Sequence, residues 1–540
     1  MVNSNDYHSN NSNIQCLIIF YLLELFSPKL LFSVRFFVAL MAFFGYAIQY
    51  MNKINLGIAI ICMVNYTALN KKPILNESIE YYNESSSYTL LNLTLDLTKN
   101  ISEKNNQCLT QKSHGTNIEG SFIWSKSIQG FTLASYFWGY IITQIPSGYL
   151  SSKYGARNVL GYTNLIAGIL TVVSPFCANA GYIALSICRF FIGLAHGALW
   201  PAMLSLYVHW TPRNERTKII GAAGAGAWVG NIIALPVGGV LCLYGFGGGW
   251  PSIFYIFGAI GIIWSIAFLI FISDSPKTNK FISKHEMKYI LEETKKEVSA
   301  KEGRKLTTPW KRIFTSKVCW ATFIAHLCNN WGNYLYLTQL PSFMKDVLKF
   351  DIKSNGFMSA LPYIACALST SILALISEKI INSKKISKTN VRRIFNGIGM
   401  IGPLVMLICL SFVTCKNPYS GVIFLIVALG LNGFFWSAGP LVNINDIGGA
   451  YSGVIFGIAN TFGTIPGIIC PYIVGVITKN QTQQEWQIVF VICAIIYFIG
   501  AAVFWFFADS NIQSWALVEN LSNEDIQQST FTLNEKENKI

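Results

Sequence analysis

Two basic residues stand inside stretches of sequence that are otherwise apolar enough to lie in lipid. Lys53 lies within YMNKINLGIAIICMVN, and Arg189 lies at the start of CRFFIGLAHGALWPAM. A charged group near the middle of a bilayer costs a few kcal/mol or more, so such residues usually mark a functional site. The apolar runs of the N-terminal half contain no evident carboxylate to pair with these cations. We therefore expect both cations to face a shared cavity that attracts an anion.

Four of the apolar runs carry a polar stripe at helical spacing. Arg189, His196 and Trp200 lie seven and eleven residues apart, which at 100° per residue places them within about 20° of one helix face. The other stripes are Tyr46, Gln49 and Lys53; Tyr136, Tyr140 and Gln144; and Asn330, Tyr334 and Thr338. Lipid cannot solvate such groups, so we expect them to converge on a water-filled cavity. Simple packing stays open for His196 and the tyrosines, as does a position at the membrane surface for the two cations.

The composition predicts which class of protein positions these residues. Hydrophobic residues make up 52% of the 540 and charged residues only 12%, too few to cover a soluble protein. A spanning helix needs about 20 apolar residues. Candidate runs lie near 36–64, 129–149, 158–178, 182–206, 218–244, 250–273, 317–343, 356–377, 395–415, 420–443, 451–477 and 487–508. We therefore predict an all-α membrane protein with twelve transmembrane helices in two six-helix halves.

Charged and polar stretches divide the chain. We expect an N-terminal cytoplasmic or interfacial segment at 1–35, an N-terminal half at 36–273 with a long loop at 66–128, a cytoplasmic linker at 274–316, a C-terminal half at 317–508 and a tail at 509–540. Lys and Arg gather in the loops on one side, so this side and both termini are predicted to be cytoplasmic. The long loop lies on the other side. Its four N-x-S/T sequons, at Asn76, Asn83, Asn92 and Asn100, predict glycosylation in a lumenal or extracellular space.

Other classes of function find no support in the sequence. The net charge of +14 comes from basic residues in short loops, which is a topology signal and not a nucleic-acid surface. GFGGGW lacks the Lys-Ser/Thr pair of a phosphate-binding loop, and KHEM lacks the second histidine of a zinc motif. We interpret nearly all of the 13 cysteines, including Cys62, Cys188, Cys242 and Cys328, as apolar packing residues. Cys108, in the long polar loop, stays open. We expect no enzyme activity, no metal, no cofactor and no nucleic-acid partner.

Several motifs together resemble one family. They are NKINLGIAIICMVN, SYFWGYIITQIPSGYLSSKYGARNVLG, LYVHWTPRNERTK, LPSFMKDVLKFD, SALPY and GIANTFGTIPGIICPYIVGVIT. They resemble the anion:cation symporter branch of the major facilitator superfamily, which includes sialin, the vesicular glutamate transporters and the type I sodium–phosphate cotransporters. The match covers residues 36 to 516 and is closest to sialin-like members. It implies a major facilitator fold and alternating-access transport.

The resemblance also implies roles for individual residues. Lys53 stands where the family usually has a substrate-binding arginine, and Arg189 matches the fourth-span arginine. Tyr140 and Tyr334 match tyrosines of the family's cavity. With Asn330 from the polar stripe of the seventh run, these residues form the predicted substrate site.

The loop YLSSKYGARNV resembles a variant of the gating motif of the superfamily. We expect Lys153 and Arg157 to serve in gating. The usual acidic position of the motif is Ser152 here, so the gate is expected to use other contacts.

The departures from the family bear on ion coupling. His196 stands where proton-coupled members have a glutamate, and Ile192 where sialin has another. Leu133 and Asn329 stand where the glutamate transporters have a histidine and an arginine, which disfavours vesicular glutamate transport. His196 is a candidate for coupling because its reference pKa of about 6.5 suits a proton swing between an acidic lumen and the cytosol. Coupling to Na+ or Cl−, or passive movement down the membrane potential, stays open.

These features predict a secondary active transporter of organic anions, such as an acidic sugar or acidic amino acid, coupled to H+ or Na+. Lys at position 53 cannot make the planar two-pronged contact of an arginine, which favours a smaller or differently oriented anion. The alternatives are a sodium-coupled phosphate or anion cotransporter at the plasma membrane and a non-transporting solute receptor. We expect a monomer in contact with membrane lipid, located in a lysosomal or vesicular membrane or in the plasma membrane.

Overall fold

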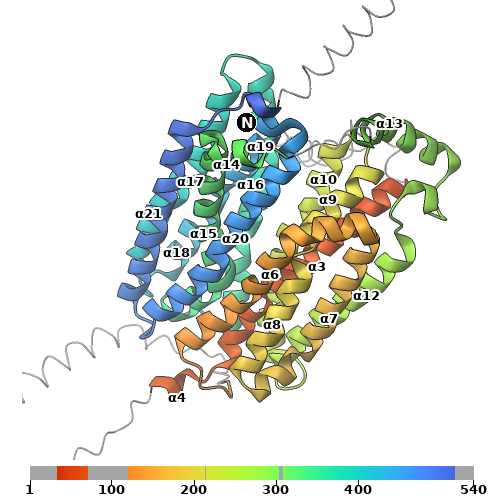
Figure 1. Cartoon of the computed structure of the whole chain (residues 1–540). Helices are drawn as coiled ribbons and strands as arrows, with labels where there is room; N and C mark the ends of the chain where they lie inside the picture. The colour runs from red at the N-terminus through yellow and green to blue at the C-terminus, as the bar shows by residue number, and fades with distance from the viewer. Residues whose placement is uncertain (1–32, 71–119, 213–214, 303–307, 517–540) are drawn as a thin grey trace, which may run out of the picture.

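The computed structural model describes residues 33–70, 120–212, 215–302 and 308–516, and its long helices form two bundles (Figure 1). The N-terminal half contains α3 (Val34–Met63), α6 (Lys126–Tyr154), α7 (Ala156–Ala180), α8 (Tyr182–His196), α9 (Leu199–Trp210), α10 (Arg216–Gly224), α11 (Gly226–Tyr244) and α12 (Pro251–Phe271), with the short α4 (Tyr66–Asn70) after α3. The C-terminal half contains α15 (Lys317–Asp346), α16 (Ile352–Asn382), α17 (Lys388–Ser411), α18 (Pro418–Ala438), α19 (Pro440–Gly448), α20 (Ser452–Ile477) and α21 (Gln483–Phe507). Between the halves lie α13 (Lys284–Glu302) and α14 (Trp310–Thr315), and two 3₁₀ turns occur at Pro276–Thr278 and Gly449–Tyr451.

Within the described residues, ten helical segments are long and apolar enough to cross a membrane. Three of these segments join two consecutive helices, namely α8 with α9, α10 with α11, and α18 with α19. The helices α6 and α15 are of similar length, at 29 and 30 residues, but carry more polar side chains. Large apolar side chains such as Ile263, 67% exposed, face outward from the bundles, as expected of a surface that contacts lipid tails. The prediction of an all-helical, multi-pass membrane protein is confirmed.

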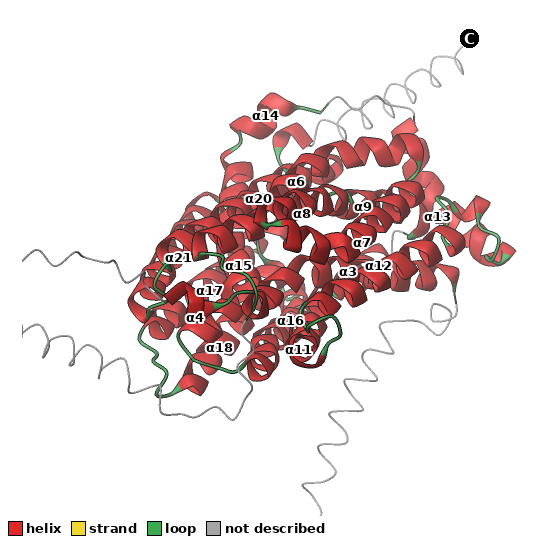
Figure 2. Ribbon diagram, turned by 90° about the horizontal axis from the view of Figure 1, so that it is seen from below, coloured by secondary structure: helices red, strands yellow, loops and turns green. Residues whose placement is uncertain are grey.

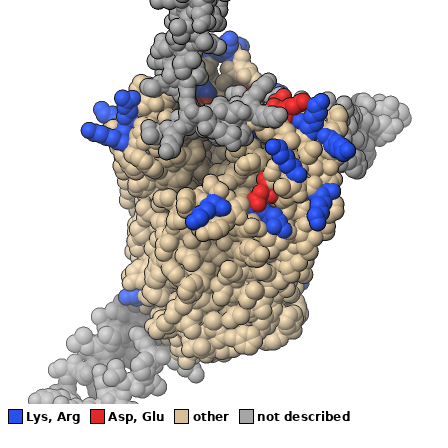
Figure 3. All heavy atoms as spheres, turned by 45° about the vertical axis from the view of Figure 1, so that its right-hand side comes forward, with Lys and Arg blue, Asp and Glu red and all other residues tan. Residues whose placement is uncertain are grey.

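The two ends of the molecule differ in chemistry. At one end, which we call the disulfide end, Cys62 near the end of α3 is bonded to Cys242 near the end of α11. At the other end, which we call the basic end and where α13 lies (Figure 1), Lys and Arg side chains are spread across the upper part of the face in Figure 3. The interpretation of Cys62 and Cys242 as packing residues was wrong, because helix ends 180 residues apart in sequence bring them together. Cys415 is disulfide-bonded as well.

The contact between the two halves is tight at the disulfide end. Here α6 packs against α20 so closely that a Cβ atom on Gly130 or Gly475 would clash with the backbone of the opposite helix. Close approach of this kind is typical of small residues at helix interfaces in membranes. At the basic end of the same helices, a Cβ atom on Gly148 or Gly457 would meet nothing within 4 Å. Figure 2 looks onto the disulfide end from below and shows the helices of the two halves packed side by side.

The linker helix α13 is fastened to the N-terminal half. Its Glu286 carboxylate accepts hydrogen bonds from the backbone N–H groups of Val34 (3.1 Å) and Arg35 (3.0 Å) at the start of α3. An acidic group at this position satisfies unpaired N–H groups and complements the helix dipole. Arg35 in turn forms an ion pair with Glu215 at 3.1 Å and lies 5.0 Å from the Tyr289 ring centroid.

Candidate functional site

The ammonium group of Lys53 lies in an aromatic cage between the two halves. Its Nζ is 5.0 Å from the ring centroid of Tyr50, 5.3 Å from Phe137, 4.8 Å from Tyr140 and 5.0 Å from Tyr334. Tyr50 belongs to α3, Phe137 and Tyr140 to α6, and Tyr334 to α15, so both halves contribute. The structure therefore brings together the predicted site residues Lys53, Tyr140 and Tyr334.

No described residue forms an ion pair or a hydrogen bond with the Lys53 ammonium group, although the residue is only 5% exposed. Each cation–π contact contributes about 0.5–2 kcal/mol, which offsets only part of the cost of burying a charge in a membrane protein. The interface between the halves thus holds a positive charge for which the described part of the chain provides no counter-ion. An anion that enters it would supply the missing partner.

Arg189 has a different environment, although it shares a region with Lys53. Its guanidinium donates to the backbone oxygens of Asn52 (3.0 Å) and Lys53 (3.2 Å) and to Oδ1 of Asn55 (2.9 Å), all on α3. It also lies 5.1 Å from the ring centroid of Tyr136. Most of its donors are therefore engaged within the N-terminal half, where they fix α8 against the part of α3 that presents Lys53.

His196 is buried beside both cations. Its Nδ1 is 3.1 Å from the hydroxyl oxygen of Tyr136, and its backbone oxygen accepts a hydrogen bond from Gln49 at 2.7 Å. The guanidinium of Arg189 lies against the ring of the same Tyr136. A proton on His196 would add a third positive charge to this neighbourhood, so its protonation should depend on whether an anion is present.

The predicted site residue Asn330 forms a polar cluster with residues that sequence reasoning missed. Its Nδ2 is 3.0 Å from Nε2 of His326, one turn earlier on α15. His326 is 2% exposed, and Asn460 of α20 lies beside it. The signal was available, because His326 extends the stripe of Asn330 and Tyr334 by one step of four residues and is an ionisable residue inside an apolar run.

A hydrogen-bonded bridge connects this cluster to the N-terminal half. Gln144 of α6 donates to the Thr464 hydroxyl at 2.6 Å and accepts from Nδ2 of Asn460 at 2.7 Å, and both partners lie on α20. Gln144 belongs to a predicted stripe but was not expected to join the halves. The interior of the interface is thus held by hydrogen bonds between uncharged groups, which other hydrogen-bonding partners can replace.

The predicted gating residues Lys153 and Arg157 lie at the basic end, and their environments differ. The backbone N–H of Arg157 donates to Oδ1 of Asp274 at 2.7 Å, and its guanidinium donates to the backbone oxygen of Leu269. Asp274, just after α12, provides the acidic contact that Ser152 cannot. Lys153 is exposed and lies 5.3 Å from the Tyr154 ring centroid. The loop is thus tied to its own half in this conformation.

Some predictions concern residues outside the described ranges. They are the four sequons at Asn76, Asn83, Asn92 and Asn100, Cys108, residues 1–32 of the predicted segment 1–35 and residues 517–540 of the predicted tail 509–540.

Two helical bundles with a caged cation between them define a membrane transporter of the major facilitator type. The chain matches the family model described as Major Facilitator Superfamily over residues 42–471. It is 36% identical to sialin of Homo sapiens over 90% of this chain and 91% of that protein. It is 35% identical to a Drosophila melanogaster protein named "Putative inorganic phosphate cotransporter" (94% and 90% covered) and 31% identical to vesicular glutamate transporter 1 of Bos taurus (91% and 80% covered). The chain belongs to the major facilitator superfamily, in the branch that contains these relatives.

Solved structures confirm the fold. A D-xylose–proton symporter has a TM-score of 0.62 at 14% identity, with 88% of this chain and 98% of the symporter covered. A bacterial homologue of the human lysosomal transporter Spinster, in an inward-facing and occupied conformation, has a TM-score of 0.60 at 13% identity, with 87% and 96% covered. The family match and the sialin and glutamate-transporter relatives, taken with the apolar helices, make the chain a multi-pass membrane transporter and not an enzyme.

Proposed function

We propose that this protein is a secondary active transporter of small organic anions that works by alternating access as a monomer. The observation that carries the proposal is the caged ammonium group of Lys53, which is buried between the halves without a counter-ion among the described residues. An anion bound there would be enclosed by α3, α6 and α15. Movement of the halves would then expose it first to one side of the membrane and then to the other.

In this proposal the binding residues divide the work. Lys53 supplies the charge, and Tyr140 and Tyr334 supply aromatic faces and hydroxyl groups around the bound anion. Asn330 and its neighbours contribute amide groups from the C-terminal half. Arg189 holds the Lys53 segment of α3 in place and adds to the positive potential.

His196 provides a route to proton coupling. Without the anion, a proton on His196 would add a third positive charge beside Lys53 and Arg189. A bound carboxylate would offset this repulsion and allow His196 to bind a proton at the same time. Anion and proton would then travel together, which is the thermodynamic requirement of symport.

We propose that the basic end faces the cytoplasm and that α6 and α15 complete a set of twelve spans. The positive-inside rule supports this orientation. The Cys62–Cys242 disulfide supports it as well, because disulfides persist in oxidising, extracytoplasmic spaces. The segment 66–128 would then be glycosylated on the lumenal or extracellular side.

A second candidate is sodium-coupled uptake of phosphate or another anion at the plasma membrane. The similarity to the Drosophila melanogaster relative favours it. Phosphate carries up to two negative charges at neutral pH, whereas the described residues of the cage supply one ammonium group without a counter-ion. A monovalent carboxylate therefore fits the charge of the cage better.

The test is uptake into proteoliposomes of sialic acid, glucuronate, aspartate, glutamate, urate and phosphate, under a proton gradient and separately under a sodium gradient. Proton-driven uptake of a carboxylate supports the proposal, and sodium-driven phosphate uptake supports the second candidate. Lys53→Ala should abolish saturable uptake, because it removes the positive charge that the aromatic rings surround. Unchanged KM and Vmax in Lys53→Ala would refute the assigned role, and ligand binding without any flux would refute transport itself.

A further inference from the structure

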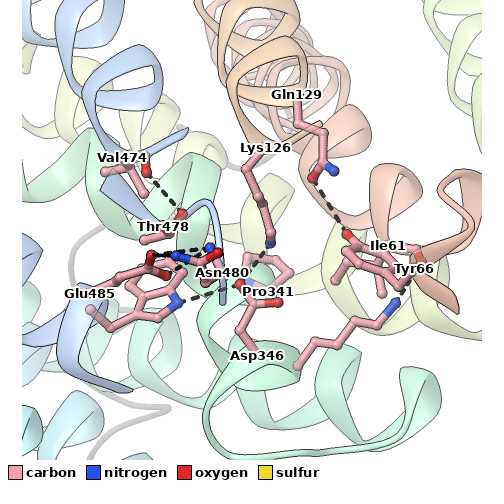
Figure 4. Close-up of polar contacts among 12 residues, drawn as sticks. Ile61, Tyr66, Lys126, Gln129, Pro341, Asp346, Val474, Thr478, Asn480 and Glu485 are labelled. Atoms are coloured by element: carbon pink, nitrogen blue, oxygen red, sulfur yellow. Dashed lines mark hydrogen bonds and ion pairs between the residues drawn. The ribbon is translucent and has the colours of Figure 1, made fainter. Parts of the chain in front are cut away.

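A buried ion pair joins the two halves at the disulfide end. Nζ of Lys126, the first residue of α6, lies 2.7 Å from Oδ2 of Asp346, the last residue of α15 (Figure 4). The side chains are 5% and 0% exposed. This is the only ion pair within the described residues that crosses from one half to the other, since the others lie within one half or within α13.

Other contacts lie around the pair and also help to hold the disulfide end closed. Nε1 of Trp486, on α21, lies 3.4 Å from the same carboxylate oxygen of Asp346. Lys345 donates to the backbone oxygen of Ile61 at the end of α3, at 3.1 Å, and its Nζ lies 3.5 Å from the ring centroid of Tyr66. The carboxylate of Asp346 thus accepts from one group of each half, while its Oδ1 has no partner.

Parting the halves at this end requires the pair to break. A buried ion pair is held by strong attraction, but each separated charge needs water or another partner. Lys126 and Asp346 lie at helix ends, where opening of the disulfide end would admit water to both. The pair is therefore stable when this end is closed and is replaced by hydrated charges when it opens.

We propose that Lys126 and Asp346 form the gate of the disulfide end, which must open for the central cage to exchange solutes with that side. These gating residues lie at the end of the molecule opposite to Lys153 and Arg157. The proposal does not depend on which solute is carried. It assigns the described conformation as closed at the disulfide end, in agreement with the close packing of Gly130 and Gly475.

The test measures access to the interface from the disulfide side. Thr338 on α15 is 3% exposed and lies eight residues, about 12 Å along the helix, inward of Asp346. With Thr338→Cys as the reporter, we would measure the labelling rate by a membrane-impermeant thiol reagent. The same variants without the reporter give the background from native cysteines.

Lys126→Met and Asp346→Asn should each raise the labelling rate at least fivefold. The charge-swapped double variant, Lys126→Asp with Asp346→Lys, should return it toward the parental rate. Arg392→Met is the matched control, because it breaks a buried pair with Asp446 inside the C-terminal half and should leave labelling unchanged. Parental labelling in both single variants, or labelling of the swapped variant as fast as that of the single ones, would overturn the proposal.

A second measurement keeps the proposal testable if the single variants do not fold. In the double variant Lys126→Cys with Asp346→Cys, a short reducible cross-linker should lower uptake of a carried solute to background, and a reductant should restore it. Full uptake by the cross-linked protein would contradict the gate. The labelling assay needs no solute, so failure of the proposed function and failure of the gate remain distinguishable.

Discussion

The two membrane-embedded cations illustrate opposite uses of a buried charge. Arg189 has three acceptors on α3 and stabilises the packing of α8 against α3. Lys53 has aromatic neighbours but no acceptor among the described residues. Charge that is left without a partner lowers stability, and proteins keep it where function requires it.

This contrast predicts opposite effects on stability. Arg189→Met should lower the thermal midpoint of the purified protein, because hydrogen bonds to a charged group contribute about 1.5–3 kcal/mol. Lys53→Met should leave the midpoint unchanged or raise it, because it removes an unpaired charge. Thermal unfolding of the two variants, matched in charge and in the residue introduced, checks this. A lower midpoint for Lys53→Met would mean that the ammonium group has a stabilising partner.

His196 provides the second prediction at this scale. If the proton travels with the anion through this residue, uptake should rise as the proton-donating side is acidified, and His196→Ala should flatten that dependence. His196→Glu should strengthen this pH dependence. A carboxylate beside two cations would stay ionised in the empty cavity and would bind a proton only when the anion is present. The measurement is the initial rate of uptake as a function of pH. An identical pH profile in the Ala and Glu variants and the parent would remove His196 from coupling.

Among the elements, α6 and α20 show how small residues set the geometry of the interface. Gly130→Ala should destabilise the protein or lower its transport rate, since the added methyl group would clash with the backbone at Pro471. Gly148→Ala on the same helix is the matched control. Its methyl group meets nothing within 4 Å, and replacing a helical glycine by alanine typically stabilises by about 0.5–1 kcal/mol. Thermal midpoints and initial uptake rates of the two variants check this, and equal effects would argue against the tight contact.

The sequence was sufficient to predict most elements, because spans of about 20 apolar residues and polar stripes at helical spacing are local properties. Lys53, Tyr140 and Tyr334 could be grouped because each lies on a polar stripe and the resemblance to the family implies one shared cavity. Contacts between distant elements were not predictable from one sequence. The Cys62–Cys242 bond, the docking of Arg157 onto Asp274 and the orientation of Arg189 toward the α3 backbone all depend on which helices become neighbours.

At the scale of the whole molecule, the halves are closed at one end and looser at the other. The uncharged bridge from Gln144 to Asn460 and Thr464 lies in the interior, with the Lys126–Asp346 pair at the disulfide end. A transporter needs two conformations of similar free energy. When the halves part, water or another amide can replace these polar contacts. Such contacts therefore meet this requirement better than a wholly apolar interface would.

The proposed orientation gives a prediction for the whole chain. Enzymatic removal of N-linked glycans should lower the apparent mass of the protein from a eukaryotic cell. Replacing Asn76, Asn83, Asn92 and Asn100 by Gln together should abolish that shift. The measurement is gel mobility before and after treatment. A glycan shift that persists in the fourfold variant would place the modification elsewhere, and no shift in the parent would contradict an extracytoplasmic loop.

One aromatic contact has a spectroscopic consequence. The indole rings of Trp228 on α11 and Trp436 on α18 lie 5.9 Å apart, centroid to centroid, with their planes at 80°. One ring belongs to each half, so relative movement of the halves must alter the distance between them. Two indoles this close influence each other's emission, which makes the pair a built-in optical reporter of the transport cycle. The difference in fluorescence between the parent and a Trp228→Phe variant would follow the motion in real time without any attached dye.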